Sequence, residues 1–165
     1  LQITIFDDTV QDDEAAFKNG ELPNYNYPDN LFSFVDDILS LKKKLEEKFL
    51  LPINFCLKTK RGEAYGSKYF GYLERLSSEN KIRLFHHSTN IYSLISESHL
   101  VICYPFVSPA EISDSLTVPS IYYDPTGSIF RQDPEDPKSL NIFVSNLDDL
   151  LSSAILILSK VVSNK

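Results

Sequence analysis

Short apolar segments alternate with segments of helical periodicity along this 165-residue sequence, and this alternation restricts the fold more than any other feature. The apolar segments carry hydrophobic residues at consecutive positions, which is typical of strands whose two faces are both buried. They predict strands at 2–6, 53–57, 82–85, 100–104, 120–123 and 140–144. Apolar residues at a 3.6-residue period predict helices at 31–49, 67–78, 91–96, 110–116 and 147–162. The sequence therefore predicts an α/β fold, a Rossmann-like parallel sheet with helices on both faces.

The length suits one domain with a single core, so we expect residues 1–165 to form one Rossmann-like domain. The sequence contains no Met and opens directly on a strand-like stretch at Leu1. We therefore expect the domain to be a fragment of a longer two-domain or multidomain protein. Removal of an N-terminal segment by processing is the alternative.

Charge and hydropathy exclude some functions. The formal net charge is -7, and phosphate contact needs a basic surface, so we expect no nucleic-acid partner. No apolar run reaches the roughly 20 residues of a membrane span. Cys56 and Cys103 both lie inside predicted strands, where a free Cys behaves as a small apolar residue. They indicate reduced core residues and a cytoplasmic protein, with the inner face of the membrane as a further location, although a disulfide stays open.

Ligands of parallel α/β sheets bind beyond the carboxyl ends of the strands, near a switch in strand order. Functional residues are therefore sought directly after each predicted strand. These residues are Asp7 and Asp8, Lys58, Lys60 and Arg61, His86, His87 and Ser88, Ser108, and Asp124 and Thr126.

The basic residues Lys58, Lys60 and Arg61 stand together in an otherwise acidic sequence. A diphosphate is bound by cations, backbone amides and helix N-termini, so the three cations could meet phosphate. Ser108 precedes a predicted helix whose first amides would suit a phosphate as well. A solvated loop is the alternative for the basic residues, and a plain helix N-cap is the alternative for Ser108.

His86 and His87 follow a predicted strand, where a neutral imidazole can donate to a phosphate or a sugar hydroxyl. We expect at least one of them to be structural, because adjacent strand residues point in opposite directions. Together with His99 and the cysteines they show no recognised ligand spacing, so no metal site is predicted. Asp124 begins an Asp-Pro-Thr-Gly turn, and a functional role for it would be binding of sugar or ribose hydroxyls.

Several common motifs are absent from the sequence. It has no Gly-x-Gly-x-x-Gly, no phosphate loop ending in Gly-Lys-Ser/Thr, and no Gly-x-Ser-x-Gly. A standard dinucleotide enzyme, a kinase-type NTPase and a hydrolase of the last class are therefore disfavoured, and no cofactor is expected.

Four stretches carry a resemblance to a known family, at residues 86–88, 91–95, 100–110 and 118–124. They resemble the C-terminal half of GT-B glycosyltransferases, over about residues 53–127. The likeness is greatest to bacterial surface-polysaccharide biosynthesis proteins, and weaker to glycerophosphotransferases of wall-polymer synthesis. It implies the donor half of a two-domain transferase, which binds a nucleotide-activated sugar while the missing domain binds a glycan or lipid-linked acceptor.

The resemblance also implies roles for individual residues. It implies that Lys58, Lys60 and Arg61 contact phosphate and that His86 and Ser88 line the cleft. It also implies that the start of a helix faces the phosphate, at Ser108, Pro109 and Ala110. Two departures from the family pattern concern catalysis. Glu111 is followed eight positions later by Pro119 instead of a second Glu, and Thr117 stands where many relatives have Gly. The catalytic base of such enzymes often lies in the other half, so no catalytic residue is assigned.

Two other interpretations compete with a donor domain. One is a non-catalytic α/β binding domain with an eroded nucleotide site, which would use the loop 132–137 and the Tyr-rich helix near Tyr69 as a partner surface. The other is a flavodoxin-like or receiver domain, whose acidic pocket would use Asp7 and Asp8. Against the receiver, Tyr123 leads into Asp124 where a Lys would be needed.

Overall fold

The computed structural model describes residues 1–10, 28–60, 67–105, 107–128 and 140–163. Six strands form one sheet, in the order β3-β2-β1-β4-β5-β6, and every neighbouring pair is parallel. The strands are β1 (Gln2–Phe6), β2 (Asn54–Lys58), β3 (Arg83–Phe85), β4 (Leu100–Cys103), β5 (Ser120–Tyr123) and β6 (Asn141–Val144). The predicted parallel sheet is confirmed.

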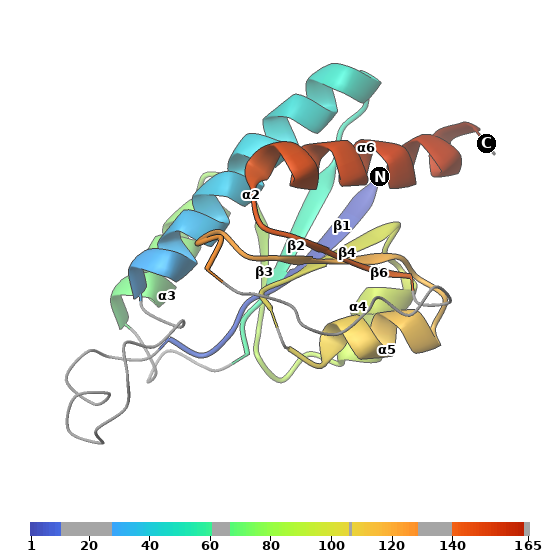
Figure 1. Ribbon diagram of the computed structural model, residues 1–165. Helices are drawn as coiled ribbons and strands as arrows, with labels where there is room; N and C mark the ends of the chain where they lie inside the picture. Colours follow the sequence, from blue (N-terminus) through green and yellow to red (C-terminus); the bar gives the residue numbers. More distant parts are fainter. Residues whose placement is uncertain (11–27, 61–66, 106, 129–139, 164–165) are drawn as a thin grey trace.

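Helices cover both faces of the sheet, as predicted. They are α2 (Pro28–Phe49), α3 (Ser67–Ser78), α4 (Ile91–Ser96), α5 (Pro109–Ser115) and α6 (Leu147–Ser163). Figure 1 shows α2 and α6 on one side of the strands and the short helices α4 and α5 on the other. We call these sides the α2 face and the α4 face.

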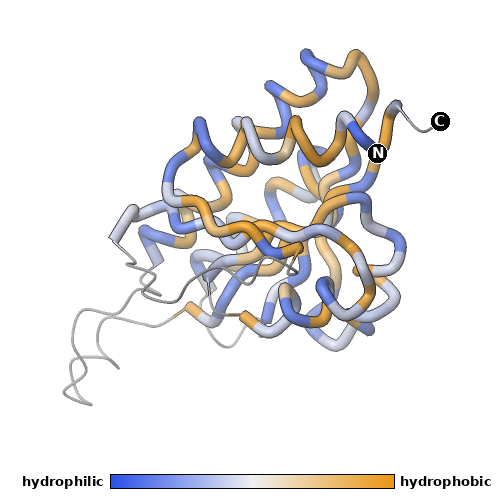
Figure 2. Tube along the Cα trace, turned by 45° about the vertical axis from the view of Figure 1, so that its right-hand side comes forward, coloured by the Kyte–Doolittle hydropathy of each residue, from blue (hydrophilic) through white to orange (hydrophobic). Residues whose placement is uncertain are grey.

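Each face of the sheet has its own core, because successive strand residues point to opposite sides. Ile3, Ile5 and Leu57 belong to the large core that α2, α3 and α6 complete. Phe6, Val101 and Cys103 belong to a smaller core under α4 and α5. Figure 2 shows the apolar strands at the centre between the two helical layers.

Helix α2 illustrates how sequence pattern becomes structure. Its residues Leu31, Phe34, Val35, Ile38, Leu41 and Leu45 recur at helical spacing, and all are buried against the sheet. The helix begins at Pro28 rather than at residue 31, so Asp29 and Asn30 lie inside its first turn and do not cap it. Proline suits this position, since its fixed φ matches the helix and its missing N–H needs no partner there.

The strand order has a switch point between β1 and β4, because β2 and β3 extend the sheet on one side of β1 and β4 to β6 on the other. This is the order of dinucleotide-binding folds and differs from the flavodoxin-like order. The flavodoxin-like or receiver interpretation of Asp7 and Asp8 is therefore wrong. Ligands of such sheets bind at the carboxyl ends next to the switch point.

Both cysteines are free and buried, as predicted. Cys56 lies in β2 and Cys103 in β4, with β1 between these strands. Burial raises the pKa of both thiols. They therefore act as small core residues and not as nucleophiles.

The left-handed residue that follows the C-cap of α5 gives a stability prediction. Thr117 has a φ of 57° and is exposed, and a left-handed conformation costs an L-residue about 1–2 kcal/mol. We expect Thr117→Gly to raise the free energy of unfolding by about 1 kcal/mol, since Gly adopts this φ without strain. Urea denaturation measures the change. Ser115→Gly, inside the same helix, is the control and should lower stability by about 0.5–1 kcal/mol; a loss in both variants would contradict strain at Thr117.

Candidate functional site

The carboxyl ends of the strands bring most of the predicted residues to one edge of the sheet. Along this edge, His86 follows β3, Lys58 ends β2, Asp7 follows β1, Ser108 comes after β4 and Asp124 follows β5. Strands lie about 4.8 Å apart, so His86 and Asp124 stand roughly 19 Å from each other. The groups nearest the switch point are those at the ends of β1 and β4, followed by those at the ends of β2 and β5.

Lys58 is a buried cation at this edge. It stands in register with Phe6 of β1 and Phe85 of β3, so the three side chains share the α4 face. Only 7% of Lys58 is exposed, and its Nζ donates one long hydrogen bond of 3.4 Å, to the carbonyl of Thr59. Burial lowers the pKa of its ammonium, an effect that the nearby Asp7 carboxylate opposes. Lys58 is flanked by two aromatic residues, and no carboxylate of the described residues accepts a hydrogen bond from it, so it is placed to receive an anion.

Asp7 comes directly after β1, the strand that pairs with β2 and Lys58, and is 2% exposed. Its Oδ1 accepts the backbone N–H of Lys60 at 2.8 Å, and its Oδ2 accepts the hydroxyl of Tyr69 at 3.0 Å. Burial raises the pKa of Asp7 to about 7, although both hydrogen bonds and the charge of Lys58 act in the opposite direction. The site therefore contains a carboxyl group that titrates near neutral pH.

Lys60 is held by the two acids that follow β1. Its Nζ lies 2.5 Å from Asp8 Oδ1, and its backbone N–H donates to Asp7. Its side chain is 47% exposed, so this cation is already paired at the surface. Arg61, the third predicted cation, lies outside the described residues.

Thr59, between the two lysines, is 4% exposed. Its hydroxyl Oγ1 is buried and has no hydrogen-bond partner within the part of the chain that the structure describes. A buried hydroxyl without a partner costs free energy that water or a ligand could recover.

His86, His87 and Ser88 lie in an exposed turn after β3. The two imidazole rings are 4.0 Å apart and tilted by 41°, and His86 Nδ1 contacts Ser88 Oγ at 2.8 Å. The alternation of strand residues does not apply to the two rings, because β3 ends at Phe85 and the chain turns there. Both rings are thus available at the surface beside β2. The expectation that at least one of the two His is structural stays a prediction.

Ser108 occupies the N-cap position of α5, which was the alternative to a phosphate contact, and it is exposed, but its side chain makes no capping hydrogen bond to the described residues. Pro109 has no N–H to offer, and the amide of buried Ala110 faces the carbonyl of Val107 at 3.5 Å. The first turn of α5 therefore presents few amides to a ligand.

Asp124 is fully buried in the turn after β5. Its Oδ1 accepts hydrogen bonds from the backbone N–H of Thr126 at 2.8 Å and from its hydroxyl at 2.6 Å. Gly127 completes the turn with a φ of 61°, a conformation that favours glycine. These contacts match the turn chemistry expected from Asp-Pro-Thr-Gly.

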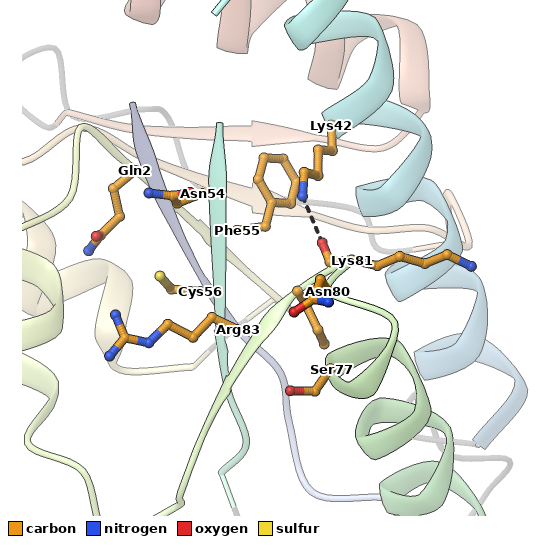
Figure 3. A pocket seen from close by; sticks show the side chains of 10 residues that line it. Gln2, Lys42, Asn54, Phe55, Cys56, Ser77, Asn80, Lys81 and Arg83 are labelled. Carbon is orange, nitrogen blue, oxygen red and sulfur yellow. Dashed lines mark hydrogen bonds between the residues drawn. The ribbon is translucent and has the colours of Figure 1, made fainter. Parts of the chain in front are cut away.

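A cavity of about 390 Å³ lies at the opposite edge, near the amino ends of the strands. Figure 3 shows its lining residues, among them Lys42, Lys81 and Arg83. Lys42 donates to the carbonyl of Lys81 at 2.9 Å, and Lys81 pairs with Glu79 at 2.7 Å. Since both lysines are engaged and the cavity is remote from the strand carboxyl ends, we do not assign the site to it.

Two features that the described residues lack bear on the type of site. They contain no group of three or more His, Cys, Asp or Glu that could hold a metal ion. Among the helices that the structure describes, none is both long and apolar enough to cross a membrane.

Sequence reasoning noted Asp7 as a strand-end residue but did not place it in the donor site. Its burial depends on Tyr69 of α3, which lies 62 positions later in the chain. Tyr69 itself is buried, and its ring meets Phe32 of α2 edge-on at 5.6 Å. The Tyr-rich helix therefore packs inward at this position, whereas the loop 132–137 lies outside the described residues.

Comparison with protein families gives one match, to the model described as polysaccharide biosynthesis PFTS motif protein, over residues 1–153. Read as amino acids, the four letters of that description match Pro105, Phe106 and Ser108, with Val107 in place of Thr. Of these residues, Pro105 and Val107 are buried directly after β4, next to the switch point. A search of curated proteins found no match.

Among solved structures, the fold is similar to that of Methanocaldococcus jannaschii UDP-GlcNAc 2-epimerase, crystallised in complex with UDP-GlcNAc and UDP. The TM-score is 0.62 and the sequence identity is 16%. The likeness covers 95% of this chain and 38% of the epimerase chain. It establishes a shared fold, and it shows that this chain spans well under half of that protein.

Proposed function

Because the chain belongs to the polysaccharide biosynthesis PFTS motif family, we propose that it is the nucleotide-sugar donor-binding domain of a glycosyltransferase acting in surface polysaccharide biosynthesis. The family membership is what the resemblance to surface-polysaccharide proteins predicted. The donor role, the transferase activity and the residues involved are the proposal.

The buried ammonium of Lys58 carries the proposal. It ends β2, one strand from the switch point, and it is flanked in register by Phe6 and Phe85. Keeping a cation in an apolar row is costly unless it has an anionic partner. A donor phosphate would supply that partner, and the hydroxyl of Thr59, which has no partner among the described residues, would be a further donor beside it.

The remaining predicted residues have more peripheral parts in this proposal. Ser108, Pro109 and Ala110 bound the site beyond β4, and His86 and Ser88 bound it beyond β3. The exposed imidazoles would donate to phosphate or sugar hydroxyls. Arg61, outside the described residues, stays a predicted phosphate contact.

The whole-protein properties belong to the proposal as well. The domain would be part of a longer two-domain or multidomain protein, whose other half binds a glycan or lipid-linked acceptor and supplies the catalytic base. It would work in the cytoplasm, at the inner face of the membrane where such acceptors are presented. No metal or cofactor is needed for the binding step that we assign to this chain.

A specific observation favours a second candidate, a binding domain with an eroded nucleotide site. The cation of Lys60 is paired with Asp8, and the carboxylate of Asp124 accepts hydrogen bonds from its own turn. Such a domain would keep the fold and bind a protein partner without a nucleotide.

Nucleotide titration distinguishes the two candidates. CMP, UDP, GDP and CDP are each added to the full chain, and amide shifts in NMR spectra and heat in calorimetry are recorded. Saturable binding of one nucleotide, with shifts at the ends of β1, β2 and β4, supports the donor site and names the donor class. No binding at millimolar concentration would contradict it and favour the eroded domain.

Replacement of Lys60 should weaken nucleotide binding only slightly. Since its ammonium is exposed and already paired with Asp8, we expect Lys60→Ala to weaken nucleotide binding only about threefold, in line with the small worth of exposed ion pairs. Calorimetry on both proteins measures this. A loss of tenfold or more would mean that Lys60 leaves Asp8 and contacts the ligand directly.

A further inference from the structure

We propose that the amino edge of the sheet holds a groove for an acidic polysaccharide chain, separate from the donor site at the carboxyl edge. The groove consists of two adjoining cavities of about 390 and 370 Å³, which share Lys42, Asn80 and Lys81 as lining residues. We call it the amino-edge groove. It goes beyond the donor-binding function and does not depend on it, since it uses only the membership of the chain in a polysaccharide biosynthesis family.

The charge of the amino-edge groove is opposite to that of the whole chain. The chain has a formal net charge of -7, yet four of the described residues that line the groove are cationic and one is acidic. The acidic residue, Glu46, already accepts the backbone N–H of Ile53 at 3.1 Å. A local surplus of positive charge attracts anions, even to an acidic protein. The cations are Lys42, Lys43, Lys81 and Arg83.

Arg83 is the cation best placed to bind a carboxylate. It is the first residue of the edge strand β3, it is exposed, and its guanidinium lies 4.7 Å from the centre of the Phe85 ring. No carboxylate of the described residues lies within ion-pair distance of it. A guanidinium can bind a carboxylate through two parallel hydrogen bonds while it stacks on an aromatic ring. Arg83 is therefore available to an acidic sugar.

Lys42 of α2 lines the groove on the other side of β2. Its Nζ lies 5.9 Å from the centre of the Phe55 ring and donates to the carbonyl of Lys81 at 2.9 Å. An ammonium has three N–H groups, and among the described residues this carbonyl engages one of them. Figure 3 shows Lys42 and Arg83 on opposite sides of the strand. Cations on both sides of a strand end suit an extended chain of negative charges better than a single small anion.

Carboxamide side chains accompany the cations. Gln2 and Asn54 are in register on β1 and β2, and Asn80 lines both cavities. A carboxamide both donates and accepts hydrogen bonds, as a sugar hydroxyl does. Phe55 is the aromatic residue among the described lining residues, and at 1% exposure it offers no surface on which a base could stack. The lining therefore favours an acidic glycan over a nucleic acid.

The test compares three probes of equal length on the full chain. They are an oligosaccharide of glucuronic acid, an oligosaccharide of glucose and a single-stranded DNA oligonucleotide. Calorimetry at low and high salt gives the affinities, and amide shifts in NMR spectra locate the contact. We expect the acidic oligosaccharide to bind most tightly, with shifts at Asn54, Lys81 and Arg83. Its affinity should fall as salt screens the cations.

Matched variants test whether the groove itself is the site. Arg83→Gln and Lys43→Gln should each weaken binding of the acidic oligosaccharide by about threefold, because both side chains are exposed. Their combination should weaken it by about tenfold, since the effects of separate positions add. Lys44→Gln and Arg75→Gln are the controls and should bind as wild type does. Lys44 is the exposed neighbour of Lys43, and the Arg75 guanidinium lies 5.4 Å from the Tyr72 ring, but neither residue lines the groove.

Each contrary result has its own meaning. Equal affinity for the glucose oligosaccharide would show that the cations take no part, and equal or tighter binding of DNA would assign the groove to nucleic acid instead. Losses of the same size in the controls would mean that charge acts over the whole surface. If Arg83→Gln does not fold, Lys43→Gln on α2 and the salt dependence of wild type still decide.

The groove and the donor site fail separately. Absence of binding by all three probes would overturn the groove and leave the donor site standing, because the nucleotide titration is an independent experiment. A nucleotide that binds should leave the affinity for the acidic oligosaccharide unchanged, since the two ligands occupy opposite edges of the sheet. Displacement of one by the other would show that they share a single site.

Discussion

Lys58→Met should make the protein more stable and its nucleotide binding weaker. The Met side chain has a similar length and no charge, so it can pack between Phe6 and Phe85 without the cost of a buried ammonium. We expect the free energy of unfolding to rise by about 1–3 kcal/mol, the usual cost of burying a polar group that lacks good partners. Urea denaturation at neutral pH measures this.

The same substitution removes the cation that we assign to the phosphate. A hydrogen bond between charged groups contributes about 1.5–3 kcal/mol, so affinity should fall by roughly 10- to 150-fold. Calorimetry with the nucleotide found by titration gives the value. Lys60→Met is the matched control, because its ammonium is exposed, and it should change both stability and binding little.

A substitution that raises stability and weakens binding identifies a functional residue, since natural sites keep groups that stability alone would not select. If Lys58→Met lowers stability and leaves affinity unchanged, Lys58 is a structural residue, and the observation that carries the proposed function is lost. A fall in both would mean that the ammonium stabilises the fold as well as the bound ligand.

The architecture was predictable because the local pattern and the global fold agree. The strand 120–123 and the helices 67–78 and 91–96 were predicted with the bounds that the structure shows. Helix α6 begins where expected, because Asn146 accepts the amide of Asp149 and thereby caps it. The start of α2 was missed because Pro28 is at once a loop signal and a good first residue of a helix.

The site was predictable only in its position along the sheet edge. The rule that ligands bind at strand carboxyl ends selected Lys58 and Lys60, but the sequence does not distinguish the buried cation from the paired one. That difference depends on side-chain direction and on contacts between remote segments. The same holds for Asp7, whose environment is made by Tyr69 and by the amide of Lys60.

Phe34→Ala should give the largest loss of stability among the substitutions considered for this protein. Phe34 of α2 is fully buried, its ring meets Tyr104 edge-on at 5.3 Å, and it stacks on Tyr123 at 6.0 Å. Truncation of a buried Phe to Ala costs about 3–5 kcal/mol through lost burial and the cavity that remains. Urea denaturation should show this loss, whereas Phe34→Leu should cost less than half as much.

The same substitution tests whether the core on the α2 face affects nucleotide binding. Tyr104 follows β4 at the switch point, its amide donates to the carbonyl of Phe6 at 2.8 Å, and Phe6 is in register with Lys58. Phe34 thus packs against Tyr104 on the α2 face of the sheet, whereas Lys58 lies on the α4 face. We expect the folded fraction of Phe34→Ala, at low temperature, to bind nucleotide within about threefold of wild type, because sites without shared partners act nearly independently. A loss as large as that of Lys58→Met would show that the α2 core sets the position of the ammonium.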